Sequence, residues 1–493
     1  MKKFISLSIL ALLSAGTLVA NDVSRSFFSV RPVQVPMARQ NLLTDQARNQ
    51  GRVLGMKNLQ ISAFGGASTN SDDLARYFMM GKTTLSVKNT LDGSGADESL
   101  AFQKDIQAFN FNIDTDDTTQ RTFASTLIMK PRQTFYGASL SFRRPFRNRY
   151  WGAIETSLVH VRNHLHLDET DITAANATAQ VGIQGKNTVA NMIDAFKQDG
   201  MNFGKIDGVR TKTGIADLTL KIGYEPLMFN RNDMYMSPYL GVILPTGNKA
   251  EAVYMFEPIV GNGGHFGIMT GAHGEFDVCS LKSGRVWASY RIENQYLFQN
   301  TQKRTMDLKY NGAWSRYLTM FEDAAAKAGT TVNSLNFGTN IMTQDVHVSP
   351  GYFGNIDASF SYVGEKWNAT LGYTVHARQG EEVKLKNGWA ENASIASCSN
   401  VDTTTNPFRT IGNMLQGLDI VDTEQGVVIK ESDIDFNSAA HPGGISQSIY
   451  ASVGTFCPQH KERVFEAGAS YEFATDNTGM DRVCGWIKAQ ISF

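Results

Sequence analysis

The chain has 493 residues and is close to electrically neutral, with 46 Lys and Arg residues against 47 Asp and Glu residues. Nucleic-acid-binding proteins normally carry a basic surface, so this balance argues against that class. The mean hydropathy is −0.25. Beyond the N-terminal segment no run approaches the ~18 consecutive apolar residues that a membrane-spanning helix requires. Glycine is abundant and proline scarce, at 44 and 12 residues, which suits strands and turns.

The N-terminal segment has the layout of a secretory signal peptide. It opens with two lysines, continues with an apolar stretch and turns polar at Asn21. This order is typical of exported proteins. We expect residues 1–20 to be a signal peptide cleaved after Ala20, with cleavage after Gly16 as the alternative. No cysteine follows the apolar stretch, so a lipid-anchored form is not expected.

Alternation of apolar and polar residues recurs along the rest of the chain. Successive side chains of a β-strand point to opposite faces, so each alternating segment predicts a strand with one apolar and one polar face. The predicted strands are 59–67, 134–144, 151–161, 215–225, 234–244, 265–278, 284–293, 352–363, 366–378, 446–456, 463–473 and 482–493. Many aromatic residues stand near the strand ends.

The links between these segments alternate in length. The short links are 145–150, 226–233, 279–283, 364–365 and 457–462, and the long links are 162–214, 245–264, 294–351 and 379–445. Acidic residues favour one long loop over 69–131, although 77–87 and 102–113 would add two strands if they were also extended. Within the loops we expect helices at 189–197 and 317–328.

The last segment carries the clearest pattern. One face holds Val483, Gly485, Ile487, Ala489, Ile491 and Phe493, and the other holds Arg482, Cys484, Trp486, Lys488, Gln490 and Ser492. A last strand of this kind with a terminal aromatic residue resembles the closing strand of bacterial outer-membrane β-barrels. The resemblance implies that Phe493 is part of the signal read by the barrel-assembly machinery. An edge strand of a soluble sandwich is the alternative.

Short turns on one side and long loops on the other are typical of outer-membrane barrels. The sequence therefore predicts an all-β protein, a transmembrane antiparallel up-and-down β-barrel of about twelve strands, with fourteen as the alternative. Residues 57–493 would form the barrel with long outer loops at 69–131, 162–214, 294–351 and 379–445, and residues 21–56 a periplasmic arm or a plug. The implied partners are outer-membrane lipid, periplasmic chaperones and the assembly machinery. A homo-oligomer is left open.

The polar faces of the strands would line the lumen of the barrel. Lipid disfavours an Arg or Lys on its own face by roughly 2–4 kcal/mol at the midplane, so charged side chains should point inward. The predicted pore-lining residues are Arg143, Asp217, Lys221, Glu225, Glu275, Arg285, Arg291, Asp357, Lys366, His376, Arg378, Glu466, Glu472, Arg482 and Lys488. Both signs are balanced, so we expect weak charge selectivity. The charges either line a hydrated channel or pair with each other and with an inserted arm.

Histidines are the strongest candidates for chemistry. His160, His164 and His166 lie close together, where a metal or an acid–base site is one interpretation and a polar rim the commoner one. His265 and His273 would share an inner strand face, too far apart along the strand to bind one metal. No Ser–His–Asn or Asp–His set stands out. We therefore predict no catalytic residue, no cofactor, no metal site and no enzyme activity.

Two smaller features remain. Leu244–Asn248 reads Leu-Pro-Thr-Gly-Asn and is similar to a turn in barrels that take up aromatic degradation substrates, although any Pro-Thr-Gly turn gives this match. Cys279, Cys398, Cys457 and Cys484 are widely spaced. Cys398 and Cys484 would both lie toward the outer side, where they could form a disulfide, and unpaired cysteines are the alternative.

The expected function is a porin-like channel in the outer membrane for passive diffusion of small polar solutes. A closed-pore surface interaction protein, such as an adhesin or receptor, is one alternative. A gated transporter for small aromatic or hydrophobic compounds is another.

Overall fold

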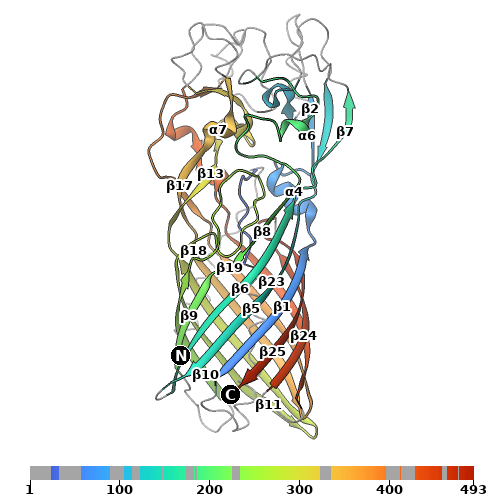
Figure 1. Cartoon of the computed structure of the whole chain (residues 1–493), viewed down its shortest axis with the longest axis vertical. Helices are drawn as coiled ribbons and strands as arrows, with labels where there is room; N and C mark the ends of the chain where they lie inside the picture. Colours follow the sequence, from blue (N-terminus) through green and yellow to red (C-terminus); the bar gives the residue numbers. More distant parts are fainter. Residues whose placement is uncertain are drawn as a thin grey trace, which may run out of the picture.

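The computed structural model describes residues 24–32, 57–88, 105–113, 123–146, 149–173, 183, 186–224, 234–322, 335–395, 411, 428–457, 463–475 and 477–493. The predicted signal peptide and residues 33–56 of the predicted arm lie outside the described residues. The described chain has two tiers, a β-barrel and a cap of loop elements stacked on one of its ends (Figure 1).

The alternating segments form one sheet that closes on itself. Thirteen strands pair in this sheet, and β5 also pairs with β6, which closes the ring. Because β8 and β9 follow one another along β6, the described chain forms a barrel with twelve strand positions. The strands are β1 (Asn58–Ser68), β5 (Arg132–Pro145), β6 (Tyr150–His164), β8 (Val209–Ile215), β9 (Leu218–Tyr224), β10 (Met234–Leu244), β11 (Gly267–Leu281), β12 (Gly284–Leu297), β18 (Gly351–Gly364), β19 (Trp367–Arg378), β23 (Gly444–Phe456), β24 (Arg463–Ala474) and β25 (Arg482–Ser492).

The prediction of twelve strands is confirmed and the alternative of fourteen is wrong. Of the two additional segments, 77–87 begins in helix α4 (Ser71–Phe78) and ends in β2 (Thr84–Lys88), and 102–113 contains β3 (Ile106–Gln107). These elements fold in the cap, because their apolar side chains pack into its core.

The last strand has the predicted two faces. The side chains of Arg482, Trp486 and Lys488 are buried, whereas Ile487 and Ile491 are exposed. β25 pairs with β24 on one side and with β1 on the other. At the end of this ladder Lys57 and Phe493 exchange two backbone hydrogen bonds of 2.8 and 2.9 Å. The last strand thus joins the first and removes the open edge of the sheet.

One predicted strand is interrupted. Segment 215–225 is divided at Ala216 and Asp217, where β8 ends and β9 begins. Leu158 pairs with Ile215 and Glu155 pairs with Thr219, so β6 has one residue fewer than its partner across this break. An extra residue of this kind is a β-bulge, which bends the strand locally.

The outside of the barrel is an apolar belt. Its exposed residues include Ile61, Leu140, Ile154, Leu158, Ile222, Leu240, Phe360, Leu371, Ile449, Val453 and Ile487. Aromatic pairs flank the belt, with Tyr296 and Tyr352 rings 4.8 Å apart at the cap end and Tyr362 and Trp367 rings 4.6 Å apart at the short-turn end. Aromatic girdles at both margins are a feature of barrels in lipid.

The long loops build the cap. Its strands are β2, β3, β4 (Ala124–Ile128), β7 (Asp168–Thr173), β13 (Asn300–Thr305), β14 (Asp307–Leu308), β15 (Thr319–Phe321), β16 (Leu335–Phe337), β17 (Thr343–Ser349), β20 (Glu382–Leu385), β21 (Ser394–Ile395) and β22 (Ile434–Asp435). Its helices are α4, α6 (Met192–Ala195), α7 (Gly338–Met342) and the 3-10 turns η1 (Ala108–Phe111), η4 (Ser315–Tyr317), η7 (Glu431–Asp433) and η8 (Phe436–Ala439).

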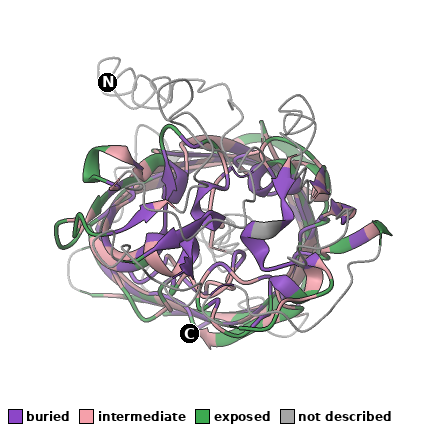
Figure 2. Cartoon of the chain, turned by 90° about the horizontal axis from the view of Figure 1, so that it is seen from above, coloured by how far each residue is buried: buried purple, intermediate pink, exposed green. Residues whose placement is uncertain are grey.

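The cap has its own apolar core, which includes Leu74, Phe78, Phe196, Trp314 and Met320. Buried cap segments therefore lie over the interior of the barrel when it is seen from above (Figure 2). The helix predicted over 189–197 is present but short. The helix predicted over 317–328 is wrong where it is described, because β15 pairs with β16 and β21 there. No helix of the described residues is long and apolar enough to cross a membrane.

Replacing Ile487 by Arg should lower the free energy of unfolding in phospholipid vesicles by about 2–4 kcal/mol, because a cation would then face hydrocarbon. Urea titration measures this change. The control is Ile172→Arg in the cap strand β7, where the side chain is already 49% exposed. That change should stay within about 0.5 kcal/mol, as for most surface substitutions. Equal losses in the two variants would mean that the belt does not face lipid.

Candidate solute path through the barrel

Most of the predicted lining residues point inward. Ten of them are buried, namely Arg143, Asp217, Glu275, Asp357, His376, Arg378, Glu466, Glu472, Arg482 and Lys488. Lys221 and Arg291 are half-buried. Whether these side chains line a conducting path stays a prediction.

Two predicted lining residues are exposed, and a third lies outside the described part of the chain. Lys366 is exposed in the turn before β19, because that strand begins one residue later than predicted. Arg285 is also exposed and lies 3.4 Å from the carboxylate of Asp277 near the short-turn end. Glu225 lies outside the described residues. His265, which was predicted to face inward on a strand, lies in the loop before β11.

A charged network crosses the middle of the lumen. Lys221 of β9 lies 2.8 Å from the carboxylate of Glu155 on β6 and 3.6 Å from that of Glu293 on β12. The Tyr239 hydroxyl donates to Glu293 at 2.7 Å. Since β9 and β12 are separated by two strands, the contact of Lys221 with Glu293 bridges across the interior rather than along the wall.

Aromatic side chains narrow the lumen at the level of Lys221. The guanidinium of Arg143 lies 4.1 Å from the ring centroid of Trp151, whose indole nitrogen donates to Ser237 on β10. Trp151 lies flat against the neighbouring strand because β9 has a glycine opposite it. A Cβ on Gly223 would be 2.2 Å from the indole ring.

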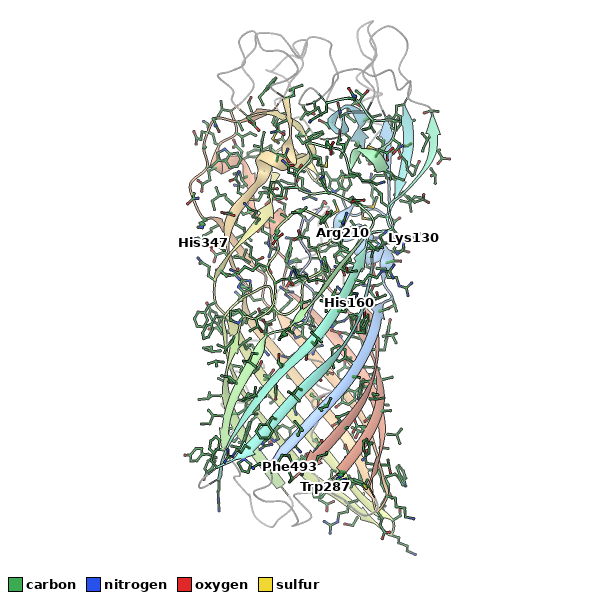
Figure 3. All side chains as sticks on the ribbon, viewed as in Figure 1. Lys130, His160, Arg210, Trp287, His347 and Phe493 are labelled. Atoms are coloured by element: carbon green, nitrogen blue, oxygen red, sulfur yellow. The ribbon has the colours of Figure 1, made fainter. Side chains whose placement is uncertain are left out.

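Toward the short turns the lumen holds a buried ion pair. Lys488 and Glu466 approach to 2.9 Å, with side chains only 1% and 3% exposed. An apolar cluster of Trp287, Val363, Phe456 and Val464 lies near this end, where Figure 3 also places Trp287 and Phe493.

The loop between β10 and β11, residues 245–266, folds inward. Asp217 at the β-bulge accepts a hydrogen bond of 2.7 Å from the Asn262 backbone. Gly261 has a φ of +85°, and a Cβ there would be 2.9 Å from the Asp217 carboxylate. Val260 belongs to one buried apolar cluster with Phe64 of β1 and Trp486 of β25. We call residues 245–266 the inward loop, because its Val260 lies in a buried cluster with side chains of the barrel strands.

A second inserted segment is Ser24–Pro32, here called the strap. At its cap end the Ser24 hydroxyl accepts from Arg316 at 2.8 Å, and Phe28 is buried in the cap core. At its other end the side chain of Arg31 lies 3.1 Å from Glu472 on β24 and 3.3 Å from Asn355 on β18. The strap therefore connects the cap to the inner wall of the barrel. The assignment of residues 21–56 as an arm or plug stays a prediction.

Small cavities remain between these obstacles. One of about 70 Å³ is lined by Pro32, Asp217 and Glu293 among others, and another of about 30 Å³ by Arg143, Trp151 and Arg291 among others. Both are lined by Gln60, Ser141, Glu155 and Lys221. One water needs about 10–15 Å³ of such space, so these cavities accommodate a few waters each. The shared residues place the two cavities next to each other, along β1, β5, β6 and β9.

Buried polar side chains also contact one another where the cap meets the barrel. Arg304 lies 3.5 Å from Glu381, and burial lowers the pKa of Arg304 to about 10. Its guanidinium also donates to Gln302, whose amide contacts Nε2 of His265 at 2.9 Å. The other ring nitrogen of His265 lies 2.8 Å from the Phe298 carbonyl oxygen. Burial lowers the pKa of His265 to about 4.

The other histidines and cysteines singled out in the sequence do not form a common site among the described residues. The rings of His164 and His166 are 3.8 Å apart, whereas His160 stacks on the exposed ring of Tyr136. Among the described residues no three His, Cys, Asp or Glu side chains are placed to hold a metal ion. Cys279, Cys457 and Cys484 carry free thiols. The proposed partner Cys398 lies outside the described residues.

No family model and no curated protein matches the chain. Among solved structures, the chain is similar to an outer membrane channel from Pseudomonas putida F1, with 7% identity and a TM-score of 0.38 over 90% of this chain and 97% of that chain. It is also similar to a Pseudomonas aeruginosa FadL homologue, with 8% identity and a TM-score of 0.28 over 96% and 97%. The Pseudomonas putida toluene transporter TodX is 9% identical, with a TM-score of 0.26 over 96% and 96%. None of these similarities assigns the chain to a family.

Replacing Glu466 by Gln should destabilise the barrel by about 3–5 kcal/mol, because the charge that balances buried Lys488 is lost. Adding Lys488→Met to the same chain should recover most of that loss. The comparison is Glu382→Gln, since Glu382 and Lys384 form a pair that is 65% and 71% exposed. Exposed pairs contribute only about 0–1 kcal/mol. Urea titration of the refolded variants measures these differences, and a double variant no more stable than the single one would contradict the pairing.

The cap should lose stability in acid through His265. Its pKa in the folded chain is about 4, below the ordinary 6.5. A lowered folded pKa favours the neutral ring, so this contribution is present above about pH 6.5 and is lost as the pH falls toward 4. The full loss is roughly 3 kcal/mol. His265→Gln should flatten this part of the pH profile. A variant whose unfolding free energy falls as steeply as that of the wild type would exclude His265 as the cause.

Proposed function

We propose that the chain is an outer-membrane channel for small polar solutes, narrowed by the strap and the inward loop. The observation that carries the proposal is a single closed sheet with an apolar outside and an ion-paired, charged inside. Hydrocarbon favours the first surface and excludes the second, and a closed sheet leaves no backbone edge unsatisfied in lipid. A polar interior suits polar solutes.

The orientation follows from the asymmetry of the links. In barrels of the outer membrane the short turns face the periplasm and the long loops face outward. We therefore place the short turns and Phe493 on the periplasmic side and the cap on the cell surface. The predicted signal peptide is consistent with this export.

The narrow interior favours a channel that conducts when an obstacle moves. The two adjacent cavities suggest the course of a solute path, and Glu155 and Lys221 line both of them. Pro32 of the strap lines the larger cavity, so displacing the strap would widen it. Passive diffusion through a permanently open lumen is the simpler form of the same proposal, and the contacts of the strap favour the gated form.

A second candidate is a surface-binding protein with a closed pore. One observation favours it. The described loop segments form small sheets around a buried core of their own. Such a cap presents a stable outer surface to a partner.

Single-channel recording of the refolded protein in a planar bilayer tests the channel. The wild type should give small, brief current steps. Phe28→Ser combined with Arg31→Ser removes the aromatic ring that the strap places in the cap core and the guanidinium that it places on the barrel wall. The double variant should raise the open time several-fold without changing the barrel wall.

The matched control is Arg76→Ser with Phe266→Ser, which replaces the same residue types at exposed positions. Its recordings should equal those of the wild type. If neither the wild type nor the strap variant passes current, although both show the gel shift of a folded barrel, the channel is rejected and the surface-binding candidate is favoured.

A further inference from the structure

The junction of the strap with the barrel contains a cavity rich in arginine. Its volume is about 30 Å³, and its lining includes Arg31, Arg378 and Arg482, with Glu472 as the only carboxylate among the lining residues. The three guanidinium groups come from the strap, from β19 and from β25. The cavity therefore carries a net positive charge.

The single carboxylate is already fully used. Glu472 accepts from Nε and Nη2 of Arg482 at 3.1 and 2.5 Å, from Arg31 at 3.1 Å and from the Ser446 hydroxyl at 2.8 Å, which fills its four acceptor positions. Arg482 also donates to the Arg31 carbonyl oxygen at 3.0 Å. Glu472 thus satisfies two of the three arginines and has no capacity for the third.

Arg378 is the third arginine, and its side chain is only partly satisfied. Its Nη1 donates to the Ser29 carbonyl oxygen at 2.8 Å. Within the described residues its Nε and Nη2 have no hydrogen-bond acceptor, and the nearest carboxylate oxygen, from Glu381, is 3.6 Å from Nη2. Arg378 is 8% exposed, so bulk water does not replace the missing acceptors.

Glu381 does not neutralise Arg378 alone. It also lies 3.5 Å from Arg304 and accepts from the His441 backbone at 3.0 Å. Four arginines, Arg31, Arg304, Arg378 and Arg482, therefore share two carboxylates at this level. Among the residues that the structure describes, this group of arginines lacks a further acceptor with negative charge.

We propose that this cavity is a binding site for a small oxyanion, such as a phosphate or carboxylate group, and that it makes the channel anion-selective. A guanidinium presents parallel N–H donors that match two oxygens of such a group. Arg378 would supply that fork, and Arg31 and Arg482 the surrounding positive potential. The site is incomplete without the strap, since Arg31 and the Ser29 carbonyl belong to it.

The sequence around the site permits its closure. Gly444 at the start of β23 lies beneath the link between β24 and β25, and a Cβ there would be 2.4 Å from the Thr478 hydroxyl. Thr478 also lines the cavity. Glycine at this position lets the link approach the barrel wall and cover the site.

Calorimetric titration of the refolded full chain with inorganic phosphate, at constant ionic strength, tests the binding site. The wild type should bind phosphate saturably. Arg378→Gln should weaken binding at least ten-fold. Arg378→Lys keeps the charge but not the planar fork, and should give an intermediate affinity. The control Arg76→Gln removes an equivalent charge from the cap surface and should bind like the wild type.

The same variants report on selectivity in a planar bilayer with a KCl gradient. The wild-type reversal potential should indicate anion preference, and Arg378→Gln should move it toward cations while Arg76→Gln does not. Absence of saturable phosphate binding in the wild type, or equal binding by Arg378→Gln, overturns the site. The selectivity rests on the proposed channel function, whereas the titration does not. If the protein binds phosphate but passes no current, the channel is rejected and the binding site is supported. If it passes current but does not bind phosphate, the binding site is rejected and the channel is supported.

Discussion

Everything in this molecule depends on the closure of one sheet. A strand edge in hydrocarbon leaves backbone donors and acceptors without partners, at several kcal/mol for each group, so a sheet in lipid must have no edge. β25 meets this requirement by pairing with β24 and β1 at once. The ladder between β1 and β25 continues without a bulge from Asn58 opposite Ser492 to Ser68 opposite Arg482. Closure then forces every second side chain inward.

The charges inside follow from that geometry. Side chains that lipid would reject are confined to a lumen twelve strands in circumference, where they must find water or partners. Lys488 finds Glu466, Lys221 finds Glu155 and Glu293, and Arg482 finds Glu472. Because these charged side chains pair with one another inside the lumen, the interior is a packed polar network with small cavities. Buried pairs of this kind add little net stability, but breaking one of them is costly.

The strap and the inward loop link the cap to the interior of the barrel. The strap has its aromatic residue in the cap core and its arginine on the barrel wall, so it connects the two levels of the molecule. The inward loop has a similar position, with Met255 and Phe256 in the cap core and Val260 on the inner wall. Both segments therefore contact the cap core and the interior of the barrel.

The sequence by itself determined the class of fold, the strand positions and the direction of most charged side chains. Alternation with a period of two is a local property, and a strand such as β24 or β25 shows both faces without reference to any neighbour. The prediction was least accurate where a contact between distant segments decides the outcome. The interruption of 215–225 depends on the inward loop, which supplies the backbone donor to Asp217.

Only the tertiary structure could show that the loops share a core and that Ser24–Pro32 enters the lumen, because those contacts join residues hundreds of positions apart. Likewise, it alone decided that Glu472 serves Arg31 and Arg482 while Arg378 is left with spare donors. A list of charges fixes their number and sign, but which of them meet depends on the register of twelve strands and the course of the strap.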